Sequence, residues 1–476
     1  MSQIQKRSVL LFGVYGTQPS NRDRVIREVA DAGLRVVMAK IASDNSENML
    51  AKLYGDSGNG SETRIQPDAT EVLPDDVGEI SRDEAVRLRR DHGKDWCVMP
   101  MSDYVTEYAA EISTELSESC YPRRSAEIAK RKHELRDLWN RLAGRPDSGL
   151  YGVEYCYVES GENDRFEYHA SPGFDALPEE TPIVVKPDEL SSSIEVHFAA
   201  SKMEAVRLAH DICGQLRSKW SEVGRAIGTQ VRPRVVMEAA IQRSTDFHAG
   251  SEFSIEFISF EGKHHPIGIT QKWTGPNFIE TGQLFPAESF PERLRPALER
   301  AINELLDQLQ VRYCVSHWEF IITTDERIAL VEGHLRPAGD RIMELIEYST
   351  GRSPVAALCE ALAGRKKNFS FVPRVSCGIF WMVPETPVEE VTQIEVERAV
   401  TDALCEDLYL NHRGIMATPS WSHATDWMAR FAHVLATGSN LRSIKNCCRD
   451  VAASVILSGK RNAASASTPL KLAVDQ

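Results

Sequence analysis

Short apolar runs and amphipathic segments alternate along the first hundred residues of the chain. Residues 8–12 are almost entirely apolar, residues 20–32 repeat their apolar positions with the period of a helix, and residues 35–39 are apolar again. With glycines between them, these segments predict a strand, a turn, a helix and a second strand, which is one βαβ unit. A further helical pattern and a short apolar run, DWCVMP, follow. We therefore expect an α/β unit over residues 1–120.

From residue 121 the pattern changes to long amphipathic segments and β-type runs. The charged segment 125–144 predicts one helix that ends at Gly144. Hairpins are predicted around Glu261 and Gly262 and again within 317–340. The remaining strands and helices are predicted at 182–187, 194–199, 202–222, 232–241 and 291–310. This order indicates two α/β lobes joined near 238–242.

Beyond residue 366 the sequence resumes a β character. The segment RVSCGIFWMVPE predicts a strand, and a later helix is expected to begin near Ser439 or Asn440. From Ser458 the chain is rich in alanine and serine, and we expect it to fray. The predicted fold class is α/β (α+β), divided at 1–120, 121–366 and 367–476.

The predicted hairpin within 317–340 carries histidine and glutamate inside both of its strands. Because side chains alternate along a strand, His317 and Glu319 share one face, as do Glu332 and His334. A turn at 324–327 would pair Glu319 with Glu332 and His317 with His334. Directly paired Cβ atoms lie about 4.5–5.5 Å apart, and like charges at that distance are destabilising. The hairpin therefore calls for a cation or a proton.

Two interpretations of this polar face stay open from the residues alone. One is a solvated face whose charge is offset by Arg327 or Arg336. The other is a metal site, where two carboxylates favour magnesium and the added histidines favour zinc or manganese. In either case, replacing Glu332 by glutamine should relieve repulsion and leave the metal-free protein no less stable.

Several cationic and hydroxyl side chains add to the picture. Lys186 ends an apolar strand, and the serine loop Ser191, Ser192 and Ser193 offers hydroxyl and N–H groups that can hold phosphate oxygens. Taken alone, the lysine is equally consistent with an edge residue that extends to water, and the loop with a flexible turn. Lys132 and Arg136 share a helix face, which alone indicates a solvated surface. Lys272 follows a strand, and the three lysines taken together with the opposed carboxylate pair and Arg336 predict a site for a polyphosphate with magnesium.

Composition narrows the classes of partner. The net charge of −14 argues against nucleic acid as a partner, and no apolar run reaches the roughly 20 residues of a membrane span. The apolar run near the N-terminus reads as a first strand rather than a signal peptide. Ten scattered cysteines without a CxxC pair fit a reducing cytoplasm. We expect small-molecule substrates and, as the default for such an enzyme, a homodimer.

A resemblance to a known family emerges at this point. The succession KRKHELR, IVVKP…SSSIEV, VVMEAAI, GSEFSIEFISFEGK, ITQK, HWEF and ALVEGHLRPAGDRI resembles the ATP-grasp superfamily, and within it the carboxylate–amine ligases known as L-amino acid ligases. The resemblance covers residues 121–360. It implies an ATP-grasp fold with a Rossmann-like domain before it, a two-lobed nucleotide-binding core and a small C-terminal α+β region.

The resemblance also implies roles for particular residues. Lys132 and Lys186 would contact ATP phosphates together with the serine loop, and Glu319 and Glu332 would bind Mg²⁺, with Mn²⁺ as the alternative. Arg336 would contact the acyl phosphate or the substrate carboxylate, and Lys272 another phosphate group. The segment expected to hold adenine is Glu238, Ala239, Ala240 and Ile241, and the residues expected beside the substrate are His334 and Gly339.

Two positions depart from the family pattern. The loop is serine-rich where relatives are glycine-rich, and His334 stands where the superfamily usually has an asparagine as a magnesium ligand. The implied reaction is amide formation from a carboxylate and an amine through an acyl phosphate, with ADP and phosphate released. The alternatives are a carboxylase that activates bicarbonate and a nucleotide-binding module without turnover. A zinc hydrolase fits less well because the HExxH spacing is missing.

Overall fold

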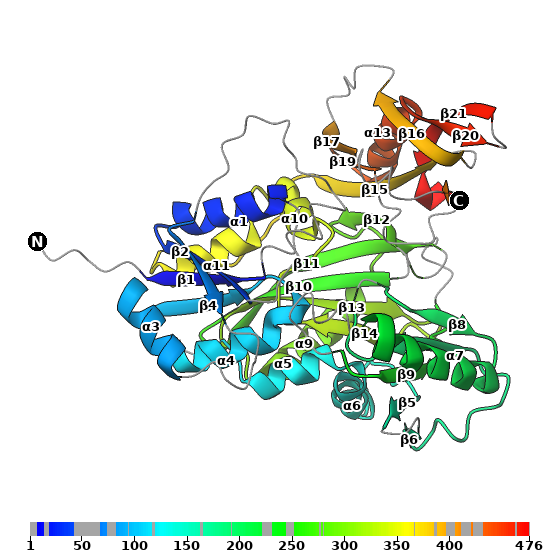
Figure 1. Cartoon of the computed structure of the whole chain (residues 1–476), viewed down its shortest axis with the longest axis horizontal. Helices are drawn as coiled ribbons and strands as arrows, with labels where there is room; N and C mark the ends of the chain where they lie inside the picture. The colour runs from blue at the N-terminus through cyan, green and yellow to red at the C-terminus, as the bar shows by residue number, and fades with distance from the viewer. Residues whose placement is uncertain are drawn as a thin grey trace, which may run out of the picture.

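The structure is a computed structural model of the chain (Figure 1). It describes residues 7–13, 19–41, 67–73, 82–93, 95–116, 120–161, 165–191, 193–220, 231–243, 252–275, 278, 280–365, 367–384, 388–396, 405–410, 420–421, 432–461 and 464–475. These residues form three sheets with helices packed around them (Figure 1). Mixed helix and sheet confirms the predicted fold class.

A four-stranded parallel sheet forms the N-terminal part, in the order β3-β2-β1-β4. Its strands are β1 (Ser8–Phe12), β2 (Arg35–Ile41), β3 (Ala69–Leu73) and β4 (Trp96–Pro100). The predicted βαβ unit is confirmed, with α1 (Pro19–Asp31) between the first two strands. After α3 (Arg82–His92) and β4, the chain forms a short 3-10 helix, η2 (Asp103–Val105), and then α4 (Thr106–Leu116). The sequence pattern did not predict β3, because its apolar positions are few.

The predicted single helix over 125–144 is wrong, because the chain breaks it at Arg131. Two helices form instead, α5 (Arg123–Lys130) and α6 (Lys132–Ala143), and Arg131 between them has extended dihedral angles, φ −88° and ψ 108°. Asp188 stabilises the new helix start: its backbone oxygen accepts from the Lys132 N–H at 3.1 Å, and its carboxylate accepts from the His133 N–H at 3.1 Å. A partner distant in sequence therefore supplies the helix cap.

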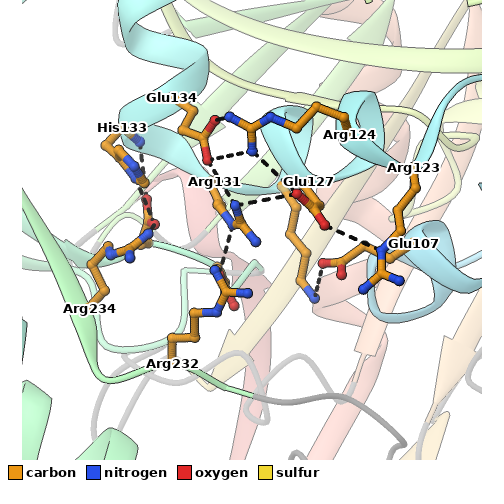
Figure 2. A network of polar contacts seen from close by, with 12 residues as sticks. Glu107, Arg123, Arg124, Glu127, Arg131, His133, Glu134, Arg232 and Arg234 are labelled. Atoms are coloured by element: carbon orange, nitrogen blue, oxygen red, sulfur yellow. Dashed lines mark hydrogen bonds and ion pairs between the residues drawn. The ribbon is translucent and has the colours of Figure 1, made fainter. Parts of the chain in front are cut away.

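A network of ion pairs surrounds this break (Figure 2). Arg131 contacts Glu134 at 2.9 Å and Glu189 at 3.2 Å, while His133 contacts Asp188 at 2.8 Å. Asp188 and Glu189 begin the serine loop, so the network ties the base of that loop to the helix that carries Lys132.

An antiparallel sheet of five described strands forms the second layer, in the order β6-β5-β9-β7-β8. Its strands are β5 (Tyr155–Ser160), β6 (Phe166–Ala170), β7 (Ile183–Pro187), β8 (His197–Ala199) and β9 (Arg234–Ala239). The helix α7 (Lys202–Gln215), followed by the π-helical turn η4 (Leu216–Trp220), packs on β7 and β9. Lys186 lies near the end of β7, and Glu238 lies near the end of the neighbouring strand β9.

The third sheet is the largest, with twelve strands in the described part of the chain. Its central strands run antiparallel in the order β14-β13-β10-β11-β12-β15. They are β10 (Glu252–Phe260), β11 (Lys263–Thr274), β12 (Glu280–Phe285), β13 (Cys314–Ile322), β14 (Ile328–His334) and β15 (Ser376–Pro384). Connecting and covering elements are η7 (Glu292–Leu294), α9 (Arg295–Gln308), α10 (Ile342–Thr350) and α11 (Pro354–Leu362). Helix α11 packs against α1 of the N-terminal part.

The C-terminal strands continue the same sheet through β15. They are β16 (Val388–Val396), β17 (Cys405–Leu410), β18 (Ser420–Trp421), β19 (Ala432–Gly438), β20 (Val455–Arg461) and β21 (Ala464–Leu472), followed by η9 (Ala473–Asp475). Helix α13 (Leu441–Ala453) begins after Asn440, whose side chain accepts from the Ser443 N–H, which confirms the expected cap. The expected fraying from Ser458 is wrong, because β21 pairs with both β20 and β15.

The register of the β13–β14 hairpin confirms the predicted pairs at the polar face. Glu319 pairs with Glu332 and His317 with His334. The predicted turn is wrong by one residue, since the strands end at Ile322 and Ile328 and leave a five-residue loop. A β-bulge at Val331 compensates for this one-residue error. It leaves Val331 without a partner in the β13–β14 ladder and shifts the register by one residue between Phe320 and Glu319.

No helix among the described residues is long and apolar enough to cross a membrane. All ten cysteines are free thiols.

Candidate active site

A cavity of about 210 Å³ lies between the five-stranded sheet and the β13–β14 hairpin. It is lined by Lys132, Val184, Lys186, Leu190, Ser191, Ser193, Val196, Phe198, Glu238, Ala239, Ala240, Ile241, Arg243, Glu252, Phe278, Glu319, Ile321, Val331 and Glu332. Every described residue that the sequence assigned to nucleotide or metal binding is therefore at this cavity. Ser192 lies outside the described residues, and Lys272, His334, Arg336 and Gly339 are not part of the lining.

Lys186 is part of a buried ionic triad. Its Nζ lies 2.7 Å from Glu238, and Arg136 approaches the other oxygen of the same carboxylate at 2.9 Å. Burial alone would raise the pKa of Glu238, but Arg136 and Lys186 outweigh it and lower the pKa to about 2. Burial is also the main cause that lowers the pKa of Lys186. An edge lysine reaching for water is therefore the wrong interpretation of Lys186.

Lys132 faces the cavity from the first turn of α6. Its Nζ donates to the Leu190 carbonyl at the start of the serine loop and lies 3.5 Å from Glu332. Arg136, one turn later, is 2% exposed and donates to the Leu330 carbonyl as well as to Glu238. The solvated surface predicted for this helix face is thus wrong, because both cations meet buried acceptors.

The segment 239–241 and the serine loop complete the cavity wall. The N–H groups of Ala239 and Ala240 donate to the carbonyls of Glu154 and Pro182. On the other side, the Ser193 hydroxyl donates to the Phe278 carbonyl at 2.8 Å, a contact that joins the loop to the opposite wall. Ser193 has φ 55°, a left-handed conformation that a glycine would adopt at lower cost.

Glu319 already has cationic partners within the protein. Lys272 lies 2.5 Å from Glu319 and also contacts Glu280, and His317 lies 2.8 Å from the same Glu319 oxygen. Burial would raise the pKa of Glu319, but Lys272 and His317 hold it well below its usual range. The cation that the paired carboxylates call for is therefore partly supplied by Lys272, and the face is not solvated.

Glu332 has a matching set of partners. His334 Nε2 lies 3.1 Å from one Glu332 oxygen, and Lys132 approaches the other. Burial would lower the pKa of His334, but the carboxylates of Asp103 and Glu332 raise it to about 9. At neutral pH the imidazole is thus cationic and donates from both nitrogens.

Arg336 points toward the N-terminal part of the chain. Its guanidinium forms an ion pair with Asp103, in η2, and donates to the Pro337 carbonyl at 2.8 Å. Gly339 precedes Asp340 and Arg341, which both have positive φ, 49° and 67°. Apart from its chain neighbours, the described residues place no atom within 4 Å of a Cβ built on Gly339.

Sequence reasoning missed Asp103, Glu252 and Glu280 and misinterpreted Arg136. Asp103 follows the carboxyl end of a parallel strand, β4, where α/β proteins commonly place functional residues, so a signal existed. Arg136 was seen but interpreted as a surface residue. Glu252 and Glu280 carry no signal beyond their charge.

The donor set discriminates between metals. Mg²⁺ usually takes one or two carboxylates together with waters and substrate phosphates, and the paired Glu319 and Glu332 at the cavity wall offer that. Among the described residues, no group of three His, Cys, Asp or Glu side chains has the geometry to hold a metal ion. A zinc site with three protein ligands is therefore not supported by the described residues.

Comparison with known proteins agrees with this geometry. Residues 179–344 match the ATP-grasp domain family, and the protein has an ATP-grasp fold. No curated protein matches the chain in sequence at a significant level. Among solved structures, the chain is similar to L-amino acid ligase from Bacillus licheniformis, with 15% identity, a TM-score of 0.66, and coverage of 96% of this chain and 100% of that one.

Two other solved structures show the same fold. Phosphoribosylglycinamide synthetase from Anaerococcus prevotii has 11% identity, a TM-score of 0.60, and coverage of 96% and 100% of the two chains. The biotin carboxylase domain of 2-oxoglutarate carboxylase from Hydrogenobacter thermophilus, solved with MgADP, ADP and bicarbonate, has 12% identity, a TM-score of 0.60, and coverage of 98% and 92%. At these identities the likeness concerns the fold alone.

Proposed function

We propose that this protein is an ATP-dependent ligase that joins a small carboxylate, such as an amino acid, to an amine and releases ADP and phosphate. The observation that carries the proposal is the cavity between two sheets, with Lys132 and Lys186 and the paired Glu319 and Glu332 all in its wall. Cations and carboxylates around one cavity suit a metal-bound polyphosphate. The ATP-grasp domain match and the L-amino acid ligase fold support the same assignment.

The cavity residues would divide the binding of ATP between them. Segment 239–241 would face the adenine, while Lys132, Lys186 and the serine loop would contact the phosphates. Lys186 is held at the strand end by Glu238, so its ammonium is positioned before the nucleotide arrives. Glu319 and Glu332 would hold Mg²⁺, which when bound neutralises developing charge on the phosphates.

The reaction itself needs positioned charge more than a covalent group of the enzyme. A carboxylate oxygen of the first substrate attacks the γ-phosphorus, and ADP departs to leave an acyl phosphate. The amine nitrogen then attacks the acyl carbon and loses a proton, and inorganic phosphate leaves with the electrons of the C–O bond. Arg336 and Lys272 would stabilise the anionic oxygens of these steps.

A carboxylase that activates bicarbonate is the second candidate, favoured by the similarity to the biotin carboxylase domain. Both reactions release ADP, so the nucleotide product does not separate them. Bicarbonate dependence does, since only the carboxylase needs it as a substrate.

The first prediction is the product of turnover. Purified protein given ATP, Mg²⁺ and pairs of amino acids should form ADP and phosphate in equal amounts, in bicarbonate-free buffer, with a condensed product seen by mass spectrometry. Lys186→Ala, which removes a proposed phosphate contact, should reduce the rate at least tenfold and so exclude a contaminating ATPase. Stoichiometric AMP and pyrophosphate would contradict the proposal, and turnover only with bicarbonate would favour the carboxylase.

The division at 1–120, 121–366 and 367–476, the homodimer and a cytoplasmic location remain predictions. Light scattering of the purified protein tests the dimer directly, since the monomer mass is 53.2 kDa.

A further inference from the structure

The short helix η2 brings two residues of the N-terminal part to the candidate site. Asp103 contacts His334 and Arg336, which follow it by more than 200 positions in the sequence. Its neighbour Tyr104 packs against the core of the five-stranded sheet. Two consecutive residues therefore reach both walls of the cavity.

The Asp103 carboxylate is buried and divided between two cations. One oxygen lies 2.8 Å from His334 Nδ1 and the other accepts from the Arg336 guanidinium. Asp103 is 9% exposed, and its backbone is fixed by η2, which Ser102 caps. Burial would raise the pKa of this carboxyl, but Arg336 and His334 hold it well below its usual range. A permanent charge on a rigid element is suited to orienting its partners.

The other histidine of the hairpin is held in the same way. His317 Nδ1 lies 2.8 Å from Glu256, and His317 Nε2 lies 2.8 Å from Glu319. The rings of His317 and His334 stack at 5.8 Å with an angle of 13° between their planes. Each of the paired glutamates is thus backed by an imidazole, and each imidazole is backed by a buried carboxylate on its far nitrogen. Because the same carboxylate–imidazole–carboxylate arrangement occurs twice, it indicates a specific structural role rather than a single chance contact.

We propose that Asp103 is a positioning residue for the candidate site, which directs His334 Nε2 at Glu332 and holds Arg336 away from the paired glutamates. The proposal rests on the proposed ligase function for its kinetic part. A carboxylate that fixes the far nitrogen of a histidine orients the ring and the group that the ring contacts. Without the Asp103 carboxylate, His334 Nδ1 would lose the partner that helps to fix the ring.

Arg336 needs the same restraint. The carboxylates of Glu332 and Glu319 also attract its guanidinium, after Asp103. Removing Asp103 leaves those two glutamates as the strongest remaining anions for Arg336. The guanidinium would then compete with Mg²⁺ for the carboxylates and would leave the place where it meets substrate.

The kinetic test compares Asp103→Asn with Glu111→Gln, a control that removes a half-exposed carboxylate of α4 paired only with Arg123 among the described contacts. We expect kcat of Asp103→Asn to fall 10- to 100-fold and the apparent KM for Mg²⁺ to rise, because Arg336 would then compete with Mg²⁺ for the paired glutamates. Glu111→Gln should keep the wild-type values of both kinetic constants. A residue that only supports the fold would lower the folded fraction and leave kcat per folded molecule unchanged, and that result would overturn the proposal.

A second test keeps the proposal separate from the ligase assignment and from any folding defect. The ¹⁵N signals of His334, assigned with a His334→Asn variant, should report a weaker hydrogen bond at Nδ1 and a change at Nε2 in Asp103→Asn, because an amide oxygen accepts less strongly than a carboxylate. In the His334→Asn background, Asp103→Asn should cost at least threefold less activity than in wild type. Unchanged Nε2 signals, or fully additive effects, would overturn the proposal. If the wild-type protein showed no turnover, the proposed ligase function would be wrong. The NMR test would then decide the positioning role by itself.

Discussion

At the scale of single residues, the paired glutamates show how a protein tolerates like charges at close range. From the sequence alone, Glu319 and Glu332 are expected to face each other and to need a cation or a proton between them. In the structure each has a lysine and a histidine beside it. The repulsion is therefore already balanced, which reverses the expectation that losing one carboxylate would stabilise the metal-free protein.

Glu332→Gln should accordingly destabilise the protein. Its pKa is lowered to about 2 because His334 and Lys132 outweigh the effect of burial, so the native state depends on the charge. Glutamine would leave His334 and Lys132 without the charge of their carboxylate partner, at a cost of about 1–3 kcal/mol in the free energy of unfolding at pH 7. Turnover should fall at least tenfold, because the proposed metal would lose a carboxylate.

Urea unfolding at pH 7, without nucleotide, measures this effect. Glu326→Gln is the matched control, because Glu326 lies in the exposed turn of the same hairpin and pairs with the exposed Arg293; it should change stability by less than about 0.5 kcal/mol. A Glu332→Gln variant as stable as wild type would restore the repulsion argument.

Whether the sequence reveals the role of a residue depends on how far along the chain its partners lie. Glu319, Glu332 and Lys186 were found because each has a local signal, alternation in a strand or a charge at a strand end. Arg136 was misread and Asp103 missed because their meaning lies in Glu238 and His334, which are 102 and 231 positions away. Nothing in a local pattern shows that a charged helix face will be buried against a distant carboxylate.

At the scale of elements, the β13–β14 hairpin depends on the small size of Gly333. A Cβ on Gly333 would lie 2.4 Å from the ring of Trp318, a fully buried residue on the paired strand. Gly333→Ala should therefore cost about 1–3 kcal/mol and, by moving β14, displace Glu332 and His334 together. Turnover should fall with stability.

Thermal melts and rates of Gly333→Ala test this, with Gly214→Ala as the control. Gly214 lies in α7, and a Cβ added there would meet no atom of the described residues outside its own helix within 4 Å, so alanine at this position should add about 0.5–1 kcal/mol of stability. If the two variants had the same melting temperature and rate, the close approach of Gly333 to Trp318 would not restrict the residue at position 333.

The elements also show where local patterns fail. The predicted register of the hairpin is correct at the paired glutamates, although the predicted turn is wrong. The five-residue loop and the Val331 bulge each shift the register by one residue and offset each other. The break at Arg131 was not predicted, because both flanking segments are good helix sequences and Asp188, which caps the second helix, arrives from another sheet. The tail after Ser458 has low apolar content, yet pairing with β15 orders it.

At the scale of the whole molecule, a buried carboxyl lies at the contact of α1 with α11. Burial raises the pKa of Glu28 from 4.5 to about 7, against the opposing effect of Arg24. Because the folded pKa exceeds the unfolded one, this group contributes stability that is complete below about pH 4.5 and is lost as the pH rises through 7. The loss amounts to at most about 3 kcal/mol.

Glu28→Gln should remove that pH dependence. Between pH 5 and pH 8, the variant should gain stability relative to wild type, with the largest difference at pH 8, as read from urea midpoints at each pH. Asp31→Asn, which changes an exposed carboxylate at the end of the same helix, should run parallel to wild type. A constant difference between Glu28→Gln and wild type across this range would contradict the pKa assigned to Glu28.

The contact between Asp103 and His334 joins the N-terminal part of the chain to the last strand of the hairpin. The two positions should consequently be inherited as a pair. Homologues that keep histidine at 334 are expected to keep an acidic residue at 103, whereas those with the usual asparagine would be free to change it. Chimeras that exchange the N-terminal segment between the two kinds of homologue would join mismatched halves. Such hybrids are expected to fold around an unpaired charge, so the two segments should be exchangeable only together.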